Sequence, residues 1–179
     1  MRMLKPLILG AAVLVAGAVT ASAQQAPSFG QAIAPADLAP WDIEILPSGA
    51  GLPPGSGTVA QGEAVYAAKC QACHGEKGAG QPNDRLVGGQ GTIRAGIAPV
   101  KTVGSYWPYA TTLFDYIRRA MPWTNPKSLT NDEVYAVSAY ILNLNGIIGE
   151  NDAMNAQTLA KVSMPNKGGF IPFPRWPPK

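Results

Sequence analysis

Both cysteines and the only histidine of the chain lie within the segment Cys70-Gln71-Ala72-Cys73-His74. Two thiols at this spacing can add to the two vinyl groups of one haem, and the adjacent histidine is then delivered beneath the iron. With three such residues in all, a four-ligand Cys/His zinc site and a disulfide framework are both excluded. The segment therefore predicts one covalently bound haem c.

A redox-active disulfide is the main competing interpretation of the two cysteines. Such a pair needs no neighbouring histidine, and it usually opens a helix that follows a strand. Cys70 and Cys73 instead follow a predicted helix. A structural disulfide between them would close a loop too small to stabilise the chain much. Haem attachment is therefore favoured.

The second axial ligand of the iron follows by elimination, because a second histidine does not exist in the chain. Methionine is the usual alternative and raises the reduction potential. Outside the first three residues, the methionines are Met121, Met154 and Met164. Met121 lies on a loop between two predicted helices and is favoured, whereas Met154 and Met164 are interpreted as packing residues. Lysine ligation and an open iron are the remaining alternatives.

Three helices are predicted to position these residues. They are expected at about residues 59–71, 109–120 and 131–143. Capping-box patterns precede the first and the third helix, Thr58 with Gln61 and Thr130 with Glu133. Residues 58–145 are therefore expected to form the folded domain, with a glycine-rich loop between its first two helices.

The N-terminus resembles a secretory signal in its organisation. Basic residues precede an apolar run, and Ala21-Ser22-Ala23 supplies a small-residue cleavage site, so residues 1–23 are predicted to be removed. The apolar run is shorter than the roughly 20 residues that cross a bilayer, so no membrane span is expected in the mature form. The predicted location is the periplasm.

Two proline- and glycine-rich arms flank the predicted domain, at residues 24–57 and 146–179. Proline is incompatible with long helices and central strands, so extended arms are expected. The first arm contains Trp41, and the second contains Phe170 and Trp176. Apolar residues of this size indicate that each arm either packs on its own domain or grips a partner protein.

The charge of the chain excludes one class of partner. The formal net charge is +3, and it falls to +1 when Arg2 and Lys5 leave with the signal. The only adjacent basic pair in the mature chain is Arg118-Arg119. Nucleic-acid binding therefore has no electrostatic basis in this sequence.

The order of these features resembles the class I cytochrome c family. Gly62 and Tyr66 precede the haem motif, a methionine follows it, and Tyr140 lies in the last helix. The resemblance implies an all-α fold around one haem, in which the first and last helices cross at Gly62, Tyr66 and Tyr140.

A narrower resemblance covers Leu86–Gly89, the segment from Pro99 to Pro122, residues 129–137 and Met164-Pro165-Asn166. These segments are similar to the cytochrome subunits of periplasmic sulfite and sulfur dehydrogenases, the single-haem type being the nearer match. The resemblance assigns Met121 as the iron ligand. It also implies a molybdopterin sulfite-oxidase-like dehydrogenase as electron donor and a downstream cytochrome or oxidase as acceptor.

Four further residues are weaker candidates around the haem. Tyr106 and Trp107 are predicted to donate hydrogen bonds to the haem propionates, and Arg85 to offset a propionate charge. Ordinary core packing for the aromatic residues and solvation for the arginine are the alternatives. Pro82 is expected to supply the carbonyl that orients the His74 ring, as a proline does in class I relatives.

Three functions compete on this sequence. With both axial positions filled, the iron would have no vacancy for substrate, so an electron-transfer subunit that is not catalytic alone is predicted. A freely diffusing periplasmic shuttle, or a subunit of another periplasmic dehydrogenase, is the first alternative. A haem enzyme or gas sensor with an open iron is the second.

Overall fold

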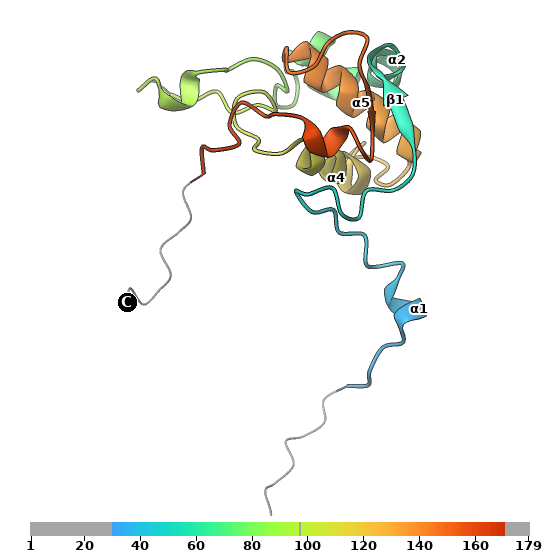
Figure 1. Ribbon diagram of the computed structural model, residues 1–179. Helices are drawn as coiled ribbons and strands as arrows, with labels where there is room; N and C mark the ends of the chain where they lie inside the picture. Colours follow the sequence, from blue (N-terminus) through green and yellow to red (C-terminus); the bar gives the residue numbers. More distant parts are fainter. Residues whose placement is uncertain (1–29, 97, 171–179) are drawn as a thin grey trace, which may run out of the picture.

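The structure is a computed structural model that describes residues 30–96 and 98–170 (Figure 1). It is mostly helical. The α-helices are α1 Pro35–Leu38, α2 Val59–Lys69, α3 Gln71–His74, α4 Ala110–Ala120 and α5 Asn131–Leu144. Short 3₁₀ turns occur at Glu76–Gly78, Thr92–Arg94 and Leu159–Lys161, and two short strands are β1 Ser56–Thr58 and β2 Ala153–Asn155. The predicted signal segment, residues 1–23, lies outside the described residues, as does Trp176 in the second arm.

The three long helices begin and end within two residues of the predicted positions. Both predicted capping boxes are present, because Thr58 accepts from the backbone of Gln61 and Thr130 from that of Glu133. The side chains of Gln61 and Glu133 in turn accept from the backbone N–H groups of Thr58 and Thr130. These local signals explain why the helix starts were predictable.

Helices α2 and α5 cross at close range, and this crossing is the centre of the fold. A Cβ atom on Gly62 would lie 1.9 Å from the carbonyl oxygen of Ala136, so only glycine permits the approach. On the same faces, the rings of Tyr66 and Tyr140 pack with centroids 5.4 Å apart. The crossing residues implied by the family resemblance are therefore confirmed.

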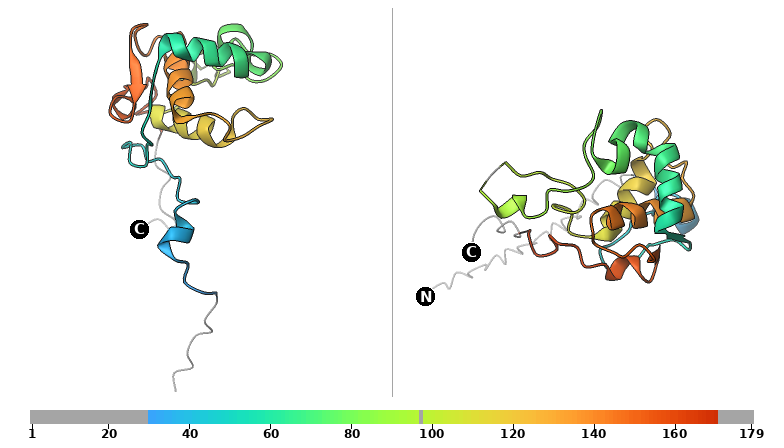
Figure 2. Two further views of the ribbon diagram at one scale, coloured as in Figure 1. Left: turned by 90° about the vertical axis from the view of Figure 1, so that its right-hand side faces the viewer. Right: turned by 90° about the horizontal axis from the view of Figure 1, so that it is seen from above.

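Helix α4 packs against α5 through one apolar face. Leu113, Phe114 and Ile117 are buried at helical spacing, and the Phe114 ring lies 4.4 Å from that of Tyr135 between centroids. Figure 2 shows that the segments following α2 and α4 both extend to the same side of α5. The fold thus directs the haem motif and the Met121 segment toward one side of the molecule.

The segment after α5 is part of the compact domain, beyond the predicted boundary at residue 145. Strand β2 pairs antiparallel with β1 and aligns Met154 with Gly57. Three side chains of the segment after α5 are buried in the core: Met154, Leu159 and Met164. This two-stranded ladder was not predicted, and it is a small addition to an otherwise helical fold.

The first arm divides into a packed part and an exposed part. The carbonyl oxygen of Pro53 accepts from the Tyr135 hydroxyl at 2.8 Å, and that of Pro54 accepts from the Asn131 amide at 3.2 Å. Ile45 is buried in the core. Residues 31–42 are exposed throughout. No helix within residues 30–96 and 98–170 has the length and apolar character needed to cross a membrane.

Candidate functional site

The two cysteines lie on one turn at the end of α2. Cys70 ends α2 and precedes α3, and its carbonyl oxygen accepts from the backbone N–H groups of Cys73 and His74 at 3.1 and 3.0 Å. Both thiols are free; Cys70 is half-buried and Cys73 is exposed. Residues three apart on a helical turn face the same side. Two thiols presented this way suit attachment to two points of one rigid, flat group.

The pKa of the Cys70 thiol disfavours a redox-active disulfide. Burial raises the pKa of the Cys70 thiol to about 11, and the nearby Lys69 ammonium only partly opposes this. Redox-active Cys-x-x-Cys pairs have lowered pKa values, which make the thiolate available for exchange. The environment of Cys70 therefore shifts this thiol in the opposite direction.

The orientation of His74 is set by a backbone carbonyl. Its Nδ1 lies 2.9 Å from the carbonyl oxygen of Asp84. A carbonyl oxygen can only accept, so Nδ1 carries the proton and donates it. Nε2 is then left with the free lone pair that a metal ligand requires. The expected role of Pro82 is wrong, because the carbonyl comes from two residues further along the chain.

The loop after His74 is held by a closely spaced set of hydrogen bonds. The Tyr66 hydroxyl donates to the carbonyl oxygen of Gly75 at 2.9 Å. The backbone N–H of Gly80 donates to the His74 carbonyl at 2.8 Å, and that of Asn83 to the Cys73 carbonyl at 2.9 Å. Gly75 has φ +74°, and a Cβ there would lie 2.4 Å from the Gly80 carbonyl oxygen. The ligand loop therefore has a fixed shape.

Met121 lies immediately after α4. Its backbone is extended, its N–H donates to the Ile117 carbonyl at 3.0 Å, and its side chain is half-buried against the core. Met154 and Met164 have exposed fractions of 4% and 3% and pack within the core cluster. Of the three methionines after the signal segment, Met121 alone lies at the edge of the core.

A cavity of about 440 Å³ lies between the end of α2 and the segment that follows α4. Its lining comes from the last residues of α2 and the segment after α4, namely Ala68, Lys69, Pro122, Thr124, Asn125 and Ser128. Cys70 and Met121 directly adjoin these two groups of residues. The lining itself includes neither the Cys70–His74 motif nor Met121. An imidazole, a thioether and two free thiols are nevertheless the donor set that a haem c requires.

The other predicted haem contacts are spread over the loop before α4. The Tyr106 ring packs edge-on against Phe170 at 5.3 Å and lies 5.1 Å from the Lys101 ammonium. Trp107 is half-buried and packs edge-on against Tyr116 at 5.7 Å. Arg85 is exposed, and its Nε lies 3.5 Å from the Ala79 carbonyl oxygen. Their propionate contacts stay predictions.

Asn145 is a buried polar residue that sequence reasoning missed. Its Nδ2 donates to the carbonyl oxygens of Leu86 and Ile141 at 3.2 and 2.9 Å. Its Oδ1 accepts from the backbone N–H of Gly88 at 3.2 Å. An asparagine at a helix C-terminus is ordinary in a sequence, so the only usable signal was its place beside Gly146. The side chain joins the end of α5 to the loop that contains Asp84.

Comparison with known proteins places these features in context. Residues 57–141 match the family described as cytochrome C oxidase, cbb3-type, subunit III. A solved structure, the sulfane dehydrogenase SoxCD from Paracoccus pantotrophus, contains a similar chain with 38% sequence identity and a TM-score of 0.76. The match covers 83% of this chain and 73% of that chain. A comparison with curated proteins found no match.

Proposed function

Because the chain belongs to the cytochrome c family, we propose that it carries single electrons on one covalently bound haem c. The observation that carries this proposal is the arrangement of the Cys70–His74 turn. Its two thiols are free, and the Asp84 carbonyl holds the imidazole with Nε2 available. A single haem follows from a single pair of cysteines in the whole chain.

Each site residue has a separate role in this function. Cys70 and Cys73 would fix the porphyrin through thioether bonds, and His74 and Met121 would ligate the iron. When bound, the haem supplies a one-electron iron couple. With His74 and Met121 both holding the iron, the chain alone would not bind and convert a substrate. It is an electron carrier rather than a catalyst.

We propose that the electron donor is a periplasmic sulfur-compound dehydrogenase of the molybdopterin, sulfite-oxidase-like type. The support is the 38% identity to a chain of the sulfane dehydrogenase SoxCD over most of both lengths. A downstream cytochrome or oxidase would accept the electron. We expect this exchange to take place in the periplasm, because residues 1–23 have the pattern of an export signal.

The haem assignment is tested by producing the chain with a cytochrome c maturation system. We expect a haem that stays with the denatured polypeptide, one iron per chain, and a one-electron redox titration. Carbon monoxide should leave the spectrum of the reduced protein unchanged if Met121 holds the iron as proposed. Prompt binding of carbon monoxide would favour an open iron and a sensor or enzyme.

The donor assignment needs a separate experiment. The ferric protein is mixed with the purified molybdenum dehydrogenase from the same source, and sulfite or thiosulfate is added. Reduction should require both the dehydrogenase and the sulfur compound. If neither compound reduces the protein in the presence of the dehydrogenase, the donor is wrong, while the electron-carrier function stands.

A further inference from the structure

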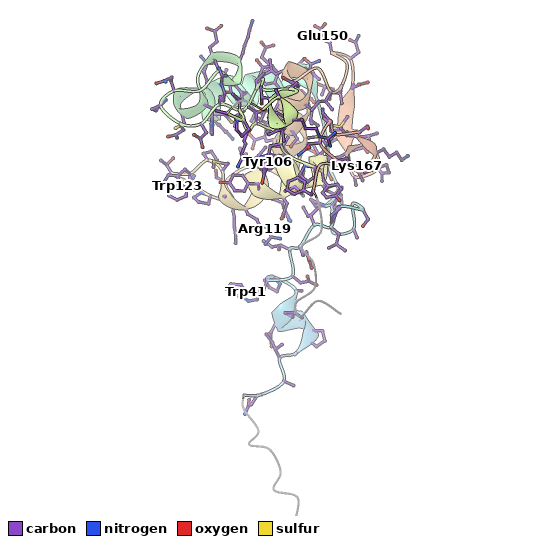
Figure 3. The ribbon with its side chains drawn as sticks, turned by 90° about the vertical axis from the view of Figure 1, so that its left-hand side faces the viewer. Trp41, Tyr106, Arg119, Trp123, Glu150 and Lys167 are labelled. Carbon is purple, nitrogen blue, oxygen red and sulfur yellow. The ribbon has the colours of Figure 1, made fainter. Side chains whose placement is uncertain are left out.

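The described part of the N-terminal arm exposes large apolar side chains. We define the docking segment as residues 31–46. It carries Ile33, Leu38, Trp41 and Leu46 with exposed fractions of 57%, 46%, 78% and 43%. Figure 1 shows this part of the chain leaving the compact domain, and Figure 3 shows Trp41 away from it. A tryptophan buries about 150–250 Å² when it packs against a partner. The exposed Trp41 side chain could therefore contribute a large favourable free energy of apolar burial on binding.

The docking segment has local structure despite its exposure. The short helix α1 is closed by bonds from the backbone N–H groups of Asp37 and Leu38 to the carbonyl oxygen of Ala34. The N–H groups of Trp41 and Asp42 then donate to the Leu38 carbonyl at 2.9 and 3.0 Å. These turns restrict the backbone conformation of the segment and hence the directions of its apolar side chains. A preformed segment loses less entropy on binding than an unstructured one.

One end of the docking segment is clamped to α4. The Arg119 guanidinium donates through Nη2 to the Ile43 carbonyl at 2.9 Å and through Nε to Asp115 at 2.7 Å. The next odd-numbered side chain, Ile45, is buried in the core. Arg119 lies two residues before Met121. The docking segment is therefore held against α4, the helix that Met121 directly follows.

The charge of the segment indicates the surface that would receive it. Asp37, Asp42 and Glu44 are exposed, and residues 24–57 contain no lysine, arginine or histidine. An apolar face flanked by carboxylates is complementary to an apolar groove with a rim of lysine or arginine. A nucleic acid or an anionic membrane surface would repel it.

The comparison with SoxCD includes part of this segment. The match covers 83% of 179 residues, which is about 149 residues. Residues 43–179 number about 137, that is 179 less 42, so the match must extend to residues before Ile43. Part of the chain before Ile43 therefore has a counterpart in that dehydrogenase structure.

We propose that residues 31–46 dock in an apolar, basic-rimmed groove on the dehydrogenase, with Trp41 as the central contact and Arg119 as the clamp. This inference rests on the proposed donor. The exposed arm would then have a defined partner, because the enzyme that binds the segment would also deliver the electron. Docking would tether the partner beside α4.

The test measures binding of the haem-loaded mature protein to the purified molybdenum dehydrogenase from the same source. Trp41→Ala should weaken binding about tenfold or more, as expected for a central aromatic contact. Trp41→Phe is the matched control, because it keeps a large apolar ring at the same exposed position. It should change the affinity little. Both variants should keep the wild-type haem spectrum, which shows that the domain is intact.

The charge complementarity has its own variant, in which Asp37, Asp42 and Glu44 become amides. This variant should bind more weakly and show a smaller loss of affinity as salt is raised. Equal binding of wild type and Trp41→Ala would overturn docking by the segment while leaving the donor assignment in place. A wild type that fails to bind the dehydrogenase would overturn both. Loss of self-association in Trp41→Ala, without a change in dehydrogenase affinity, would assign the segment to a second copy instead and overturn the proposal.

Discussion

The imidazole Nδ1 of His74 lies 2.9 Å from the carbonyl oxygen of Asp84, ten residues further along the chain. This contact depends on the shape of the intervening loop. The loop is fixed on one side by the bond from the Asn83 N–H to the Cys73 carbonyl and on the other by the bond from the Leu86 N–H to the Gly78 carbonyl. Asn145 holds the carbonyl oxygen of Leu86 from the end of α5. The position of the proposed axial ligand thus depends on a residue far from it in sequence.

Replacement of Asn145 tests this dependence. Asn145→Ala removes the partner of the Gly88 N–H and one of the two donors to the Leu86 carbonyl, the other being the Val103 N–H. We expect the free energy of unfolding to fall by about 1–3 kcal/mol. A looser loop would weaken the bond from His74 to Asp84 and make the imidazole a poorer electron donor to iron. The reduction potential should therefore rise, which redox titration of the haem-loaded protein measures.

The matched control is Asn143→Ala on the same helix. The Asn143 amide donates to the Ile148 carbonyl at 3.1 Å, on the side of α5 that leads to the C-terminal segment. Its loss should lower stability without changing the potential. Equal shifts of potential in both variants would contradict a positioning role for Asn145.

The sequence was most informative where a function depends on neighbouring residues. The haem motif, the capping boxes at Thr58 and Thr130, and the glycine at the helix crossing are all local patterns with one dominant explanation. The mostly helical fold followed from them. These features need no knowledge of the distant chain.

The sequence was least informative where residues far apart meet. Strands of three residues show no alternation, so the pairing of Gly57 with Met154 left no pattern to detect. The bond from Asn145 to Leu86 joins positions 59 residues apart. The carbonyl that orients His74 belongs to a backbone, and any residue type supplies one. Only the folded loop selects Asp84 over Pro82.

Met121→Ala is expected to open the sixth position of the iron. The ferric protein should lose the weak far-red band that iron–thioether ligation produces, and its reduction potential should fall, because methionine ligation raises it. Met154→Ala is the control, since Met154 is buried in the core. It should cost about 2–5 kcal/mol of stability but leave the band intact. If Met121→Ala kept the band, another residue would be the ligand.

Gly62→Ala tests the helix crossing on which the site depends. The added Cβ would lie 1.9 Å from the Ala136 carbonyl oxygen, and both atoms belong to helices that cannot shift independently. We expect at least 1–3 kcal/mol of destabilisation from overpacking, measured by denaturant unfolding followed by circular dichroism. Gly91→Ala is the comparison, because a Cβ there meets no atom within 4 Å, although its φ of +81° adds backbone strain. A wild-type midpoint for Gly62→Ala would contradict the crossing.

The ion pair between Lys69 and Glu133 should make the fold sensitive to acid. Its atoms lie 2.5 Å apart, and the Lys69 hydrogen bond, followed by the bond from the Thr130 N–H, lowers the pKa of Glu133 below its usual 4.5. A lowered pKa contributes stability above the ordinary carboxyl pKa, and this contribution is lost as pH falls through the lower, folded value. Glu133→Gln keeps an oxygen for the helix cap but removes the charge. Its stability should therefore decline less steeply below pH 4.5 than that of wild type, and an identical decline would contradict the coupling.

Tyr66→Phe should have its clearest effect at alkaline pH. Burial raises the pKa of the Tyr66 hydroxyl to about 12, and the hydroxyl donates to the Gly75 carbonyl beside His74. At neutral pH, loss of this bond should cost about 0.5–1.5 kcal/mol. A raised pKa gives stability that is complete below the unfolded value of about 10 and is lost as pH rises toward the folded value. Wild type should therefore lose this contribution between pH 10 and about 12, whereas the phenylalanine variant has none to lose. The difference in unfolding free energy between the two proteins, measured by denaturant titration at a series of pH values, should shrink across that window, and a constant difference would show that ionisation of Tyr66 is not coupled to folding.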